Sequence, residues 1–302
     1  MAIAADFAGT MAWNAAVGPR SDDRMALSSG VDVPQTGGPV TSALSSKLVV
    51  RNVSKTYKLN RRANIVALEN VDFSIRRNEI CTLLGPSGCG KSTLLRIMAG
   101  LDQATSGEVL LDGDPIVGTS RHCGMVFQTY TSFPWLTVLK NVEYGLRING
   151  VPKKERRERA EFFLDRVHLT AVKNAYPTQL SGGMKQRVAI ARMLANAPEI
   201  ALMDEPFGAL DAETRRSMQE LLKEVIADTD MTVVLVTHDI MEALFLADRI
   251  VFMSRNPGRV RDLIPLSFKA GHQIATREQL LDTPGCIDYE RHILGLMREA
   301  TA

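Results

Sequence analysis

The feature that most constrains this chain is a glycine-rich stretch, Gly85-Pro86-Ser87-Gly88-Cys89-Gly90-Lys91-Ser92-Thr93. Four residues separate its outer glycines, and Lys and Ser follow, which is the pattern of a phosphate-binding loop. The apolar run Ile80–Leu84 before it predicts a buried strand, and residues 92–99 after it predict a helix that Gly100 ends. A strand, a glycine loop and a helix in this order predict a nucleoside triphosphate site.

Each residue type in this loop suits contact with phosphate. Glycines without side chains let backbone N–H groups converge on phosphate oxygens, and the helix start adds the positive end of its dipole. Lys91 is expected to reach the β- and γ-phosphates, and the Ser92 hydroxyl to bind Mg²⁺, a hard ion that prefers oxygen ligands. The alternative is a glycine-rich turn that only joins strand to helix, and both flanking segments disfavour it.

An acidic pair supplies the second half of the expected site. Asp204 and Glu205 follow the apolar run Ile200–Met203, so Asp204 is expected at the carboxyl end of a sheet strand, holding Mg²⁺ or its water shell opposite Ser92. Glu205 is expected to orient and deprotonate an attacking water, and such general-base help is typically worth about 10²–10⁴ in rate. The alternative is a solvated acidic turn before Pro206.

Composition excludes several classes of protein. With 45% hydrophobic and 23% charged residues, the 302-residue chain has an ordinary globular composition. Its net charge of +2 gives no reason to expect a nucleic-acid partner. The four cysteines have neither zinc spacing nor a disulfide framework, which fits a reducing cytosol. No run of 18 apolar residues occurs, and the N-terminus lacks the features of a secretory signal, so neither a membrane span nor export is expected.

Hydrophobic periodicity predicts an α/β fold. The apolar runs 200–203 and 233–236, with a helix over 212–227 between them, predict a doubly wound core, that is, a mostly parallel sheet with helices on both faces. Residues 48–53 and 71–75 predict further strands, the second with alternating burial. From about 133 to 195 the pattern becomes helical, which predicts an inserted helical subdomain.

The chain is expected to have three parts. Residues 1–46 are rich in Ala, Gly, Ser, Thr and Pro and predict a flexible tail. Residues 47–264 predict the folded nucleotide domain, and residues 265–302 a C-terminal extension with a last helix over 289–299.

The stretch Leu180–Arg187, with the sequence Leu-Ser-Gly-Gly-Met-Lys-Gln-Arg, resembles the signature motif of ATP-binding cassette (ABC) ATPases. The resemblance covers about residues 47–260. Other family markers occur in the expected order, namely Tyr57, the phosphate loop, Gln128, the signature, Asp204-Glu205, Ala209-Leu210-Asp211 and His238. It implies the ABC ATPase fold: a P-loop core, an antiparallel β subdomain and an inserted helical subdomain.

The resemblance also implies roles for single residues. Tyr57 would stack on adenine, Gln128 would sense Mg²⁺ and the γ-phosphate, and His238 would contact that phosphate as a switch. The family closes as a head-to-tail dimer in which the signature of one subunit binds the ATP of the other. The residues carried over for this second contact are Ser181, Gly182, Gly183 and Gln186, with Asp211 for communication between the subunits.

Three local stretches, Phe133–Val142, Leu180–Arg187 and Ser254–Arg259, resemble the ATPase subunits of bacterial importers for nitrate, sulfonate or taurine-like solutes. Ser132, the long N-terminal tail and the C-terminus depart from the commoner pattern. This branch implies a transmembrane permease, an indirect solute-binding partner, and a position on the cytoplasmic face of the inner membrane. Phe133, Pro134 and Trp135 are expected to contact the permease, with core packing as the alternative.

Two other functions stay open at this stage. One is a soluble cassette ATPase that acts on nucleic acid or ribosomes, which the single signature, the lack of a long heptad repeat and the lack of a basic face disfavour. The other is a regulatory subunit that binds ATP without hydrolysing it, which the presence of Glu205 and His238 disfavours.

Overall fold

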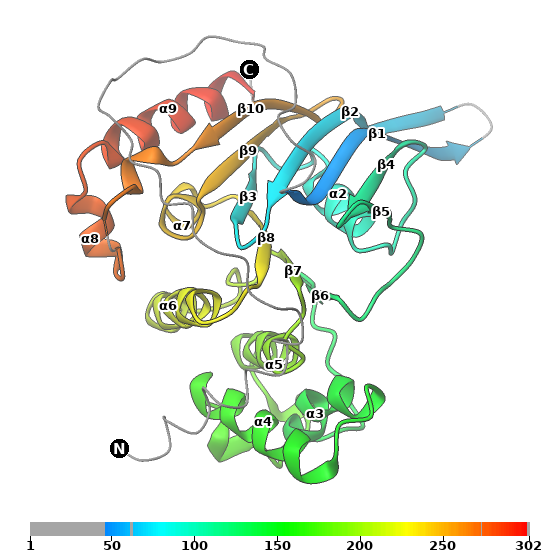
Figure 1. Ribbon diagram of the computed structural model, residues 1–302, viewed down its shortest axis with the longest axis vertical. Coiled ribbons are helices and arrows are strands. Elements are labelled where there is room, and N and C mark those ends of the chain that lie inside the picture. Colours follow the sequence, from blue (N-terminus) through cyan, green and yellow to red (C-terminus); the bar gives the residue numbers. More distant parts are fainter. Residues whose placement is uncertain (1–45, 61–62, 273, 301–302) are drawn as a thin grey trace, which may run out of the picture. The chain divides into compact units, whose positions relative to one another are not determined.

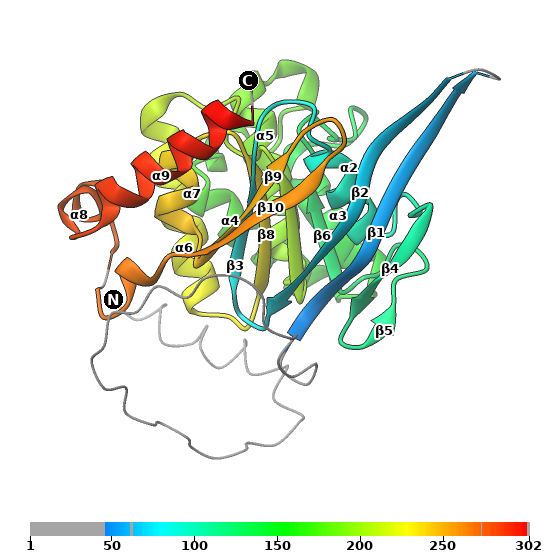
Figure 2. The same ribbon diagram turned by 90° about the horizontal axis from the view of Figure 1, so that it is seen from above.

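The computed structural model describes residues 46–60, 63–272 and 274–300 (Figures 1 and 2). Apart from Ser46, the expected N-terminal tail lies outside the described residues. Among the helices that are described, none combines the length and the apolar character needed to cross a bilayer.

The centre of the fold is a six-stranded sheet with the order β10-β9-β3-β8-β7-β6. All its neighbouring strands are parallel except β10, which pairs antiparallel with β9 at one edge. Every residue of β3, β7 and β8 is buried, which explains why these strands occur in the sequence as continuous apolar runs. The strands are β3 (Ile80–Leu84), β6 (Cys123–Val126), β7 (Ile200–Asp204), β8 (Thr232–Thr237), β9 (Arg249–Ser254) and β10 (Arg259–Pro265).

The parallel register brings distant parts of the chain to one edge of this sheet. Leu84 at the end of β3 pairs with Thr237 at the end of β8, and Asp204 at the end of β7 pairs with Val236. Residues that directly follow these strands are therefore neighbours in space, although they are far apart in sequence. Ligands of open α/β sheets bind at such carboxyl edges.

A second, antiparallel sheet has the order β2-β1-β4-β5 and confirms the expected β subdomain. It consists of β1 (Ser46–Asn60), β2 (Ala63–Arg76), β4 (Ser106–Leu111) and β5 (Asp114–Pro115). The polar segment after Tyr57 extends the β1–β2 ribbon, with Lys58 paired to Asn64. Figure 2 shows this ribbon reaching past β4, where backbone hydrogen bonds continue the ladder without requiring an apolar face.

Helices were expected on both faces of the central sheet. The buried side chains of its strands belong to two separate hydrophobic clusters, as this arrangement requires. Ile80 and Leu84 of β3 belong to one hydrophobic cluster, with residues of α3, α5, α6 and α7, whereas Cys81 and Leu83 belong to another. The second cluster contains α2 and the inner face of the antiparallel sheet. The helices are α2 (Lys91–Met98), α3 (Val138–Ile148), α4 (Lys153–Arg166), α5 (Gly182–Ala195), α6 (Ala212–Ala227), α7 (Ile240–Leu246), α8 (Arg277–Asp282) and α9 (Cys286–Glu299).

The helical insertion and the C-terminal segment lie on different sides of the sheet region (Figure 1). Helices α3, α4 and α5 pack on one another, with short 3₁₀ turns at Thr170–Val172 and Pro177–Gln179 between α4 and α5. After β10, a 3₁₀ turn at Ser267–Lys269 leads to α8 and α9, which contact α7. Leu280 and Ile293 of this segment are fully buried in the same cluster as the helices of the core.

Candidate functional site

The glycine loop between β3 and α2 is wound around the side chain of Lys91. Its ammonium Nζ donates to the carbonyl oxygens of Gly85 (2.8 Å) and Pro86 (3.0 Å), and the side chain is buried. Gly90 has φ +90°, and a Cβ there would lie 2.6 Å from Cδ2 of Leu68, so only glycine fits. Around Gly88 the space is open, as a phosphate cradle requires. Ser87 is exposed, Pro86 and Cys89 are buried, and Thr93 is half-buried on α2.

The turn between β9 and β10, whose role the sequence did not predict, lies directly against this loop. Gly258, between β9 and β10, lies so close that a Cβ on it would be 2.2 Å from the carbonyl oxygen of Cys89. Its N–H donates to Ala67 (3.1 Å) and its oxygen accepts from Glu69 (2.9 Å), which joins β2 to the β9–β10 turn. The Ser254–Arg259 stretch had been noted as a family resemblance, and its contact with the loop gives its glycine a structural reason.

Asp204 and Ser92 lie together at the carboxyl edge of the sheet. The Ser92 hydroxyl donates to Oδ1 of Asp204 over 3.0 Å, and Asp204 is only 3% exposed. Burial raises the pKa of Asp204, although the Ser92 hydrogen bond opposes the increase. Two hard oxygen donors side by side next to a phosphate loop fit a Mg²⁺ site, because this ion takes few protein ligands and completes its shell with phosphate and water.

Glu205 is the residue on which the other expected site residues converge. Gln128 donates from Nε2 to Oε2 of Glu205 over 3.2 Å, and His238 Nδ1 lies 3.2 Å from Oε1. The Glu205 backbone has φ +46°, an uncommon value for a residue with a side chain, and its N–H donates to Val236 (3.0 Å). The structure thus brings together groups from the ends of β6, β7 and β8.

Tyr57 lies on β1 of the antiparallel sheet with its ring exposed. Its hydroxyl donates to Oδ2 of Asp102 over 2.9 Å, and Nζ of Lys55 lies 4.9 Å from the ring centroid. These contacts fix the ring while leaving part of it accessible for stacking.

The signature residues form the N-terminus of α5. Ser181 caps the helix by accepting from the N–H of Met184 (3.3 Å), and Gly182 and Gly183 form its first turn. Gln186 does not lie on that exposed surface. Its side chain is 1% exposed, and its polar atoms have no hydrogen-bond partner among the described residues. The side chain of Gln186 therefore points toward the interior, a distinction that the motif alone does not carry.

The two glycines of the signature lie against Tyr130 and Ala209. A Cβ on Gly182 would lie 2.3 Å from the hydroxyl oxygen of Tyr130, so the ring of Tyr130 is seated against this glycine. A Cβ on Gly183 would lie 3.2 Å from the carbonyl oxygen of Ala209. Asp211, in the same loop as Ala209, caps α6 by accepting from Thr214 N–H (3.0 Å), and this hydrogen bonding lowers the pKa of its carboxyl group.

A groove of about 450 Å³ lies between the end of the central sheet and the helical insertion. Its lining includes Cys123 and Met125 of β6, Phe127, Phe133, Tyr144 of α3 and Arg192 of α5. Phe133 is half-buried, with its ring centroid 4.4 Å from that of Tyr144. Trp135 is 70% exposed beside it, and Pro134 is also exposed.

The buried side chain of Asn141 holds the segment that carries these rings. Its Oδ1 accepts from the N–H of Phe133 (2.8 Å), and its Nδ2 donates to the carbonyls of Phe133 (3.1 Å) and Leu136 (3.0 Å). Asn141 is fully buried, and the sequence analysis did not identify it; a polar residue on the apolar face of α3 was the available signal. Trp135, whose side chain is 70% exposed, is therefore not part of the core.

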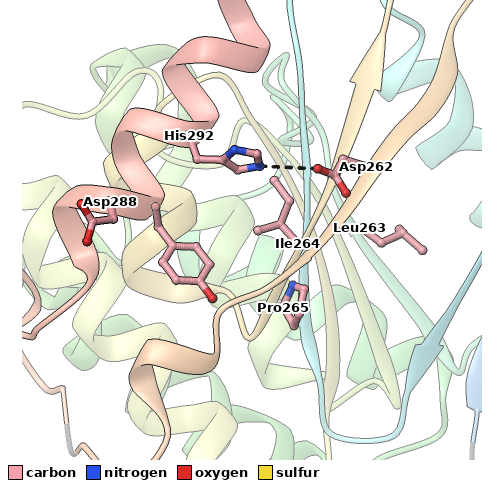
Figure 3. A pocket seen from close by; sticks show the side chains of 7 residues that line it. Asp262, Leu263, Ile264, Pro265, Asp288 and His292 are labelled. Atoms are coloured by element: carbon pink, nitrogen blue, oxygen red, sulfur yellow. Dashed lines mark ion pairs between the residues drawn. The ribbon is translucent and has the colours of Figure 1, made fainter. Parts of the chain in front are cut away.

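A second cavity, of about 320 Å³, lies between β10 and α9. Figure 3 shows His292 of α9 directed at Asp262 of β10, with Nε2 3.5 Å from Oδ2. None of its lining residues belongs to the motifs described above; they are Asp262, Leu263, Ile264, Pro265, Asp288, Tyr289 and His292.

The sheet edge, the phosphate loop and the acidic pair define a P-loop nucleoside triphosphatase. Comparison with known proteins narrows this class. The family model described as "ABC transporter" matches residues 68–208. An uncharacterized ABC transporter ATP-binding protein of Methanocaldococcus jannaschii is 46% identical over 253 residues, which covers 84% of this chain and 92% of that protein.

Two relatives have names that specify a solute. The nitrate import ATP-binding protein NrtD of Synechocystis is 42% identical and covers 80% of this chain and 91% of its own length. The taurine import ATP-binding protein TauB of Chromobacterium violaceum is 48% identical and covers 71% of this chain and 88% of its own length.

A solved structure of the ATP-binding cassette MJ0796, a dimer in a post-hydrolysis state bound to ADP and Pi, matches with a TM-score of 0.68. It is 40% identical and covers 72% of this chain and 98% of its own. The chain therefore belongs to the ATP-binding proteins of the ABC transporter family, and it is an ATPase.

Proposed function

We propose that this chain is the ATP-hydrolysing subunit of a bacterial importer for a small solute such as nitrate, a sulfonate or taurine. The observation that carries the hydrolytic part is the position of the Glu205 carboxylate between Gln128 and His238, beside the Asp204–Ser92 pair. The names of relatives at 40–48% identity support import and this range of solutes. No observation favours the alternative of a soluble cassette acting on nucleic acid or ribosomes.

In this proposal the residues at the sheet edge divide the work of hydrolysis. Lys91 leaves the carbonyls of its own loop and binds the β- and γ-phosphates together with the backbone N–H groups of residues 87–93. Ser92, Asp204 and Gln128 would hold Mg²⁺ directly or through water, and a bound ion would supply positive charge against the phosphates. Glu205 accepts a proton from the attacking water, and His238 contacts the γ-phosphate.

The 3.2 Å contacts of Glu205 with Gln128 and His238 support these assignments, because they link the acid to the residues expected to sense the phosphate. Tyr57 provides the stacking surface for adenine, and its exposed, hydrogen-bonded ring suits that role.

The second ATP contact comes from the partner subunit of a homodimer. Ser181, Gly182 and Gly183 present the N–H groups of a helix start, which is an anion site. Ala209, two residues before Asp211, lies against Gly183 at the start of α5, so Asp211 is near the signature and would carry the communication between subunits. Gln186 is buried in the single subunit, so a contact with the partner's ATP would require its side chain to become exposed on dimerisation. The matched cassette MJ0796 is itself a dimer, which supports this arrangement.

The permease partner docks at the groove beside Phe133, Pro134 and Trp135. A groove of about 450 Å³ with an exposed Trp at its rim suits a short helix with apolar side chains, since aromatic anchors dominate many interfaces. The subunit would then lie on the cytoplasmic face of the inner membrane, and a solute-binding protein would act through the permease.

The proposal is tested with Glu205→Gln. The amide keeps the size of the side chain but cannot take a proton, so ATP binding persists while phosphate release falls at least about 100-fold. ATP should then hold the variant as a dimer, measured by light scattering after gel filtration.

Glu158→Gln, at an exposed position on α4, is the matched control and retains the parent rate and the parent oligomeric state. Hydrolysis by Glu205→Gln at close to the parent rate would show that another residue is the base. Uptake of labelled nitrate or taurine by vesicles that contain the permease tests the importer assignment separately.

A further inference from the structure

The helix that follows His238 fixes where this residue lies. Helix α7 begins directly after it: Asp239 caps the helix by accepting from the N–H of Glu242 over 3.1 Å. Thr237, on the other side of His238, accepts from the N–H of Asp239 over 3.0 Å. His238 is 63% exposed at its side chain, so its position depends on this backbone rather than on packing of the ring.

A buried chain of polar side chains runs from this helix to the C-terminal segment. Glu242 is 4% exposed and accepts from Nε2 of Gln219 over 2.7 Å. Gln219, on α6, is fully buried, and its Oε1 accepts from Nε of Arg277 over 3.2 Å. The amide of Gln219 thus uses its donor toward the carboxylate and its acceptor toward the guanidinium, which is the arrangement that satisfies both charged partners.

The positive charge of Arg277 favours the ionised form of Glu242 in this network of buried polar side chains. Burial raises the pKa of Glu242, and hydrogen bonds from Thr237 and Gln219 and the charge of Arg277 oppose that increase. The Glu242 carboxyl group accepts hydrogen bonds from both Thr237 and Gln219, and Thr237 is the residue next to His238. Removing a charge partner from a buried network weakens the remaining bonds as well as its own.

A second contact holds the other end of the same helix. Lys269 lies in the 3₁₀ turn after β10, and its ammonium donates to the carbonyl oxygens of Phe245 (3.1 Å) and Ala247. Carbonyls at a helix C-terminus lack partners within the helix, and a lysine there satisfies them. Helix α7 is therefore attached to the C-terminal segment directly at its end, by Lys269, and through Gln219 near its start, by Arg277.

We propose that the C-terminal segment, residues 266–272 and 274–300, sets the position of His238 by clamping α7, and that Arg277 is a positioning residue for ATP hydrolysis. It acts through Gln219 and Glu242, not by contact with the nucleotide. This inference rests on the proposed role of His238 at the γ-phosphate. The C-terminal segment would then be a place where hydrolysis is tuned at a distance from the phosphate loop.

The test is Arg277→Met in the full chain, which removes the guanidinium and keeps the length of the side chain. We expect kcat for ATP hydrolysis to fall about 10-fold while KM for ATP changes less than about twofold, because the phosphate loop is untouched. We also expect a shift of the His238 ring signals in the NMR spectrum of histidine-labelled protein, which has five histidines. Arg277→Lys should recover part of the rate, because the charge near Glu242 returns.

The matched control is Arg291→Met, an arginine of α9 whose side chain is 76% exposed. It should leave kcat and the His238 signals at their parent values. If Arg277→Met is poorly folded, Arg277→Gln replaces it, since the amide can still donate to Gln219. A lower melting temperature with parent kcat and unmoved His238 signals would show a structural role only and overturn the proposal. His238→Ala with the parent rate would refute the proposed role of His238 at the γ-phosphate instead, while the NMR shift would still decide whether the clamp positions His238.

Discussion

Lys269 makes the stability of this protein depend on pH across the neutral range. Burial is the main cause that lowers its pKa from 10.5 to about 7, and the neighbouring charge of Lys223 lowers it further. Asp248 and Cys286 oppose this change. In the unfolded chain the same amine has the ordinary pKa of a lysine, so the two states bind different numbers of protons.

The sign and size of the effect follow from this difference. Below pH 7 both states carry the proton, and above about pH 10.5 neither does. Between these limits the unfolded state holds a proton that the folded state has released, so the free energy of unfolding rises with pH. The maximum slope is about 1.4 kcal/mol per pH unit. Because the side chain is partly exposed, we reduce the expected gain between pH 7 and pH 9 to about 1–2 kcal/mol.

The measurement compares the parent chain with Lys269→Met by thermal unfolding at several pH values from 6 to 9. The methionine fills the same space and cannot titrate, so its curve lacks the contribution of this amine. A gain of about 1–2 kcal/mol corresponds to a rise of about 2–8 °C in melting temperature for a chain of this size. The parent minus Lys269→Met difference should therefore increase by that amount from pH 7 to pH 9.

Lys153→Met, at an exposed position in the first turn of α4, is the control and should leave the pH dependence unchanged. A difference between parent and Lys269→Met that stays constant from pH 6 to 9 would show that Lys269 remains protonated in the folded protein. A difference that decreases with pH would contradict the sign of the argument.

Three further predictions concern the nucleotide site, the groove and the N-terminus. Lys91→Ala should remove most of the affinity for ATP in equilibrium binding while the protein stays folded, and unchanged affinity would refute the phosphate-loop assignment. Trp135→Ala should leave hydrolysis by the isolated subunit intact but weaken binding to the permease in co-purification by roughly 30-fold, the equivalent of about 2 kcal/mol at an aromatic anchor. The control is Val117→Ala, at another exposed apolar residue, and loss of basal hydrolysis in Trp135→Ala would favour a role in folding. Deletion of residues 1–45 should leave the ATPase rate and the melting temperature nearly unchanged, because this composition offers little apolar surface to offset ordering, and a large loss of either would show that the segment docks on the folded part.

Sequence patterns predicted the parts of this fold that local physics determines. The strands around 200–203 and 233–236 were identifiable because full burial requires uninterrupted apolar residues. The helix Ala212–Ala227 has the expected bounds, because Asp211 is a strong N-cap and the apolar period is regular. The phosphate loop and the acidic pair were identifiable because each joins a motif to a strand end.

The remaining features depend on contacts between residues that are distant in sequence. The hydrogen bonds of Gln219 to Glu242 and Arg277 span 23 and 58 residues, and no local pattern announces them. The role of Gly258 under Cys89 is set by the approach of two backbones, which appears only when β9, β10 and β2 are assembled. Burial of Gln186 within a motif expected to be exposed has the same origin, since a short motif does not say which side of the helix faces the core.

Because Tyr130 lies against Gly182, the short segment 128–135 connects the Glu205 carboxylate, the signature helix and the groove. The chain passes from Gln128, at the Glu205 carboxylate, through Tyr130, at the signature helix, to Phe133 and Trp135 at the groove. Seven peptide units span at most about 25 Å, so the covalent chain keeps these three places within that distance of one another. Asn141 of α3 holds the far end of this segment by two hydrogen bonds to the backbone of Phe133. Inserting a single glycine after Tyr130 would lengthen the connection between Gln128 and the groove without removing any side chain.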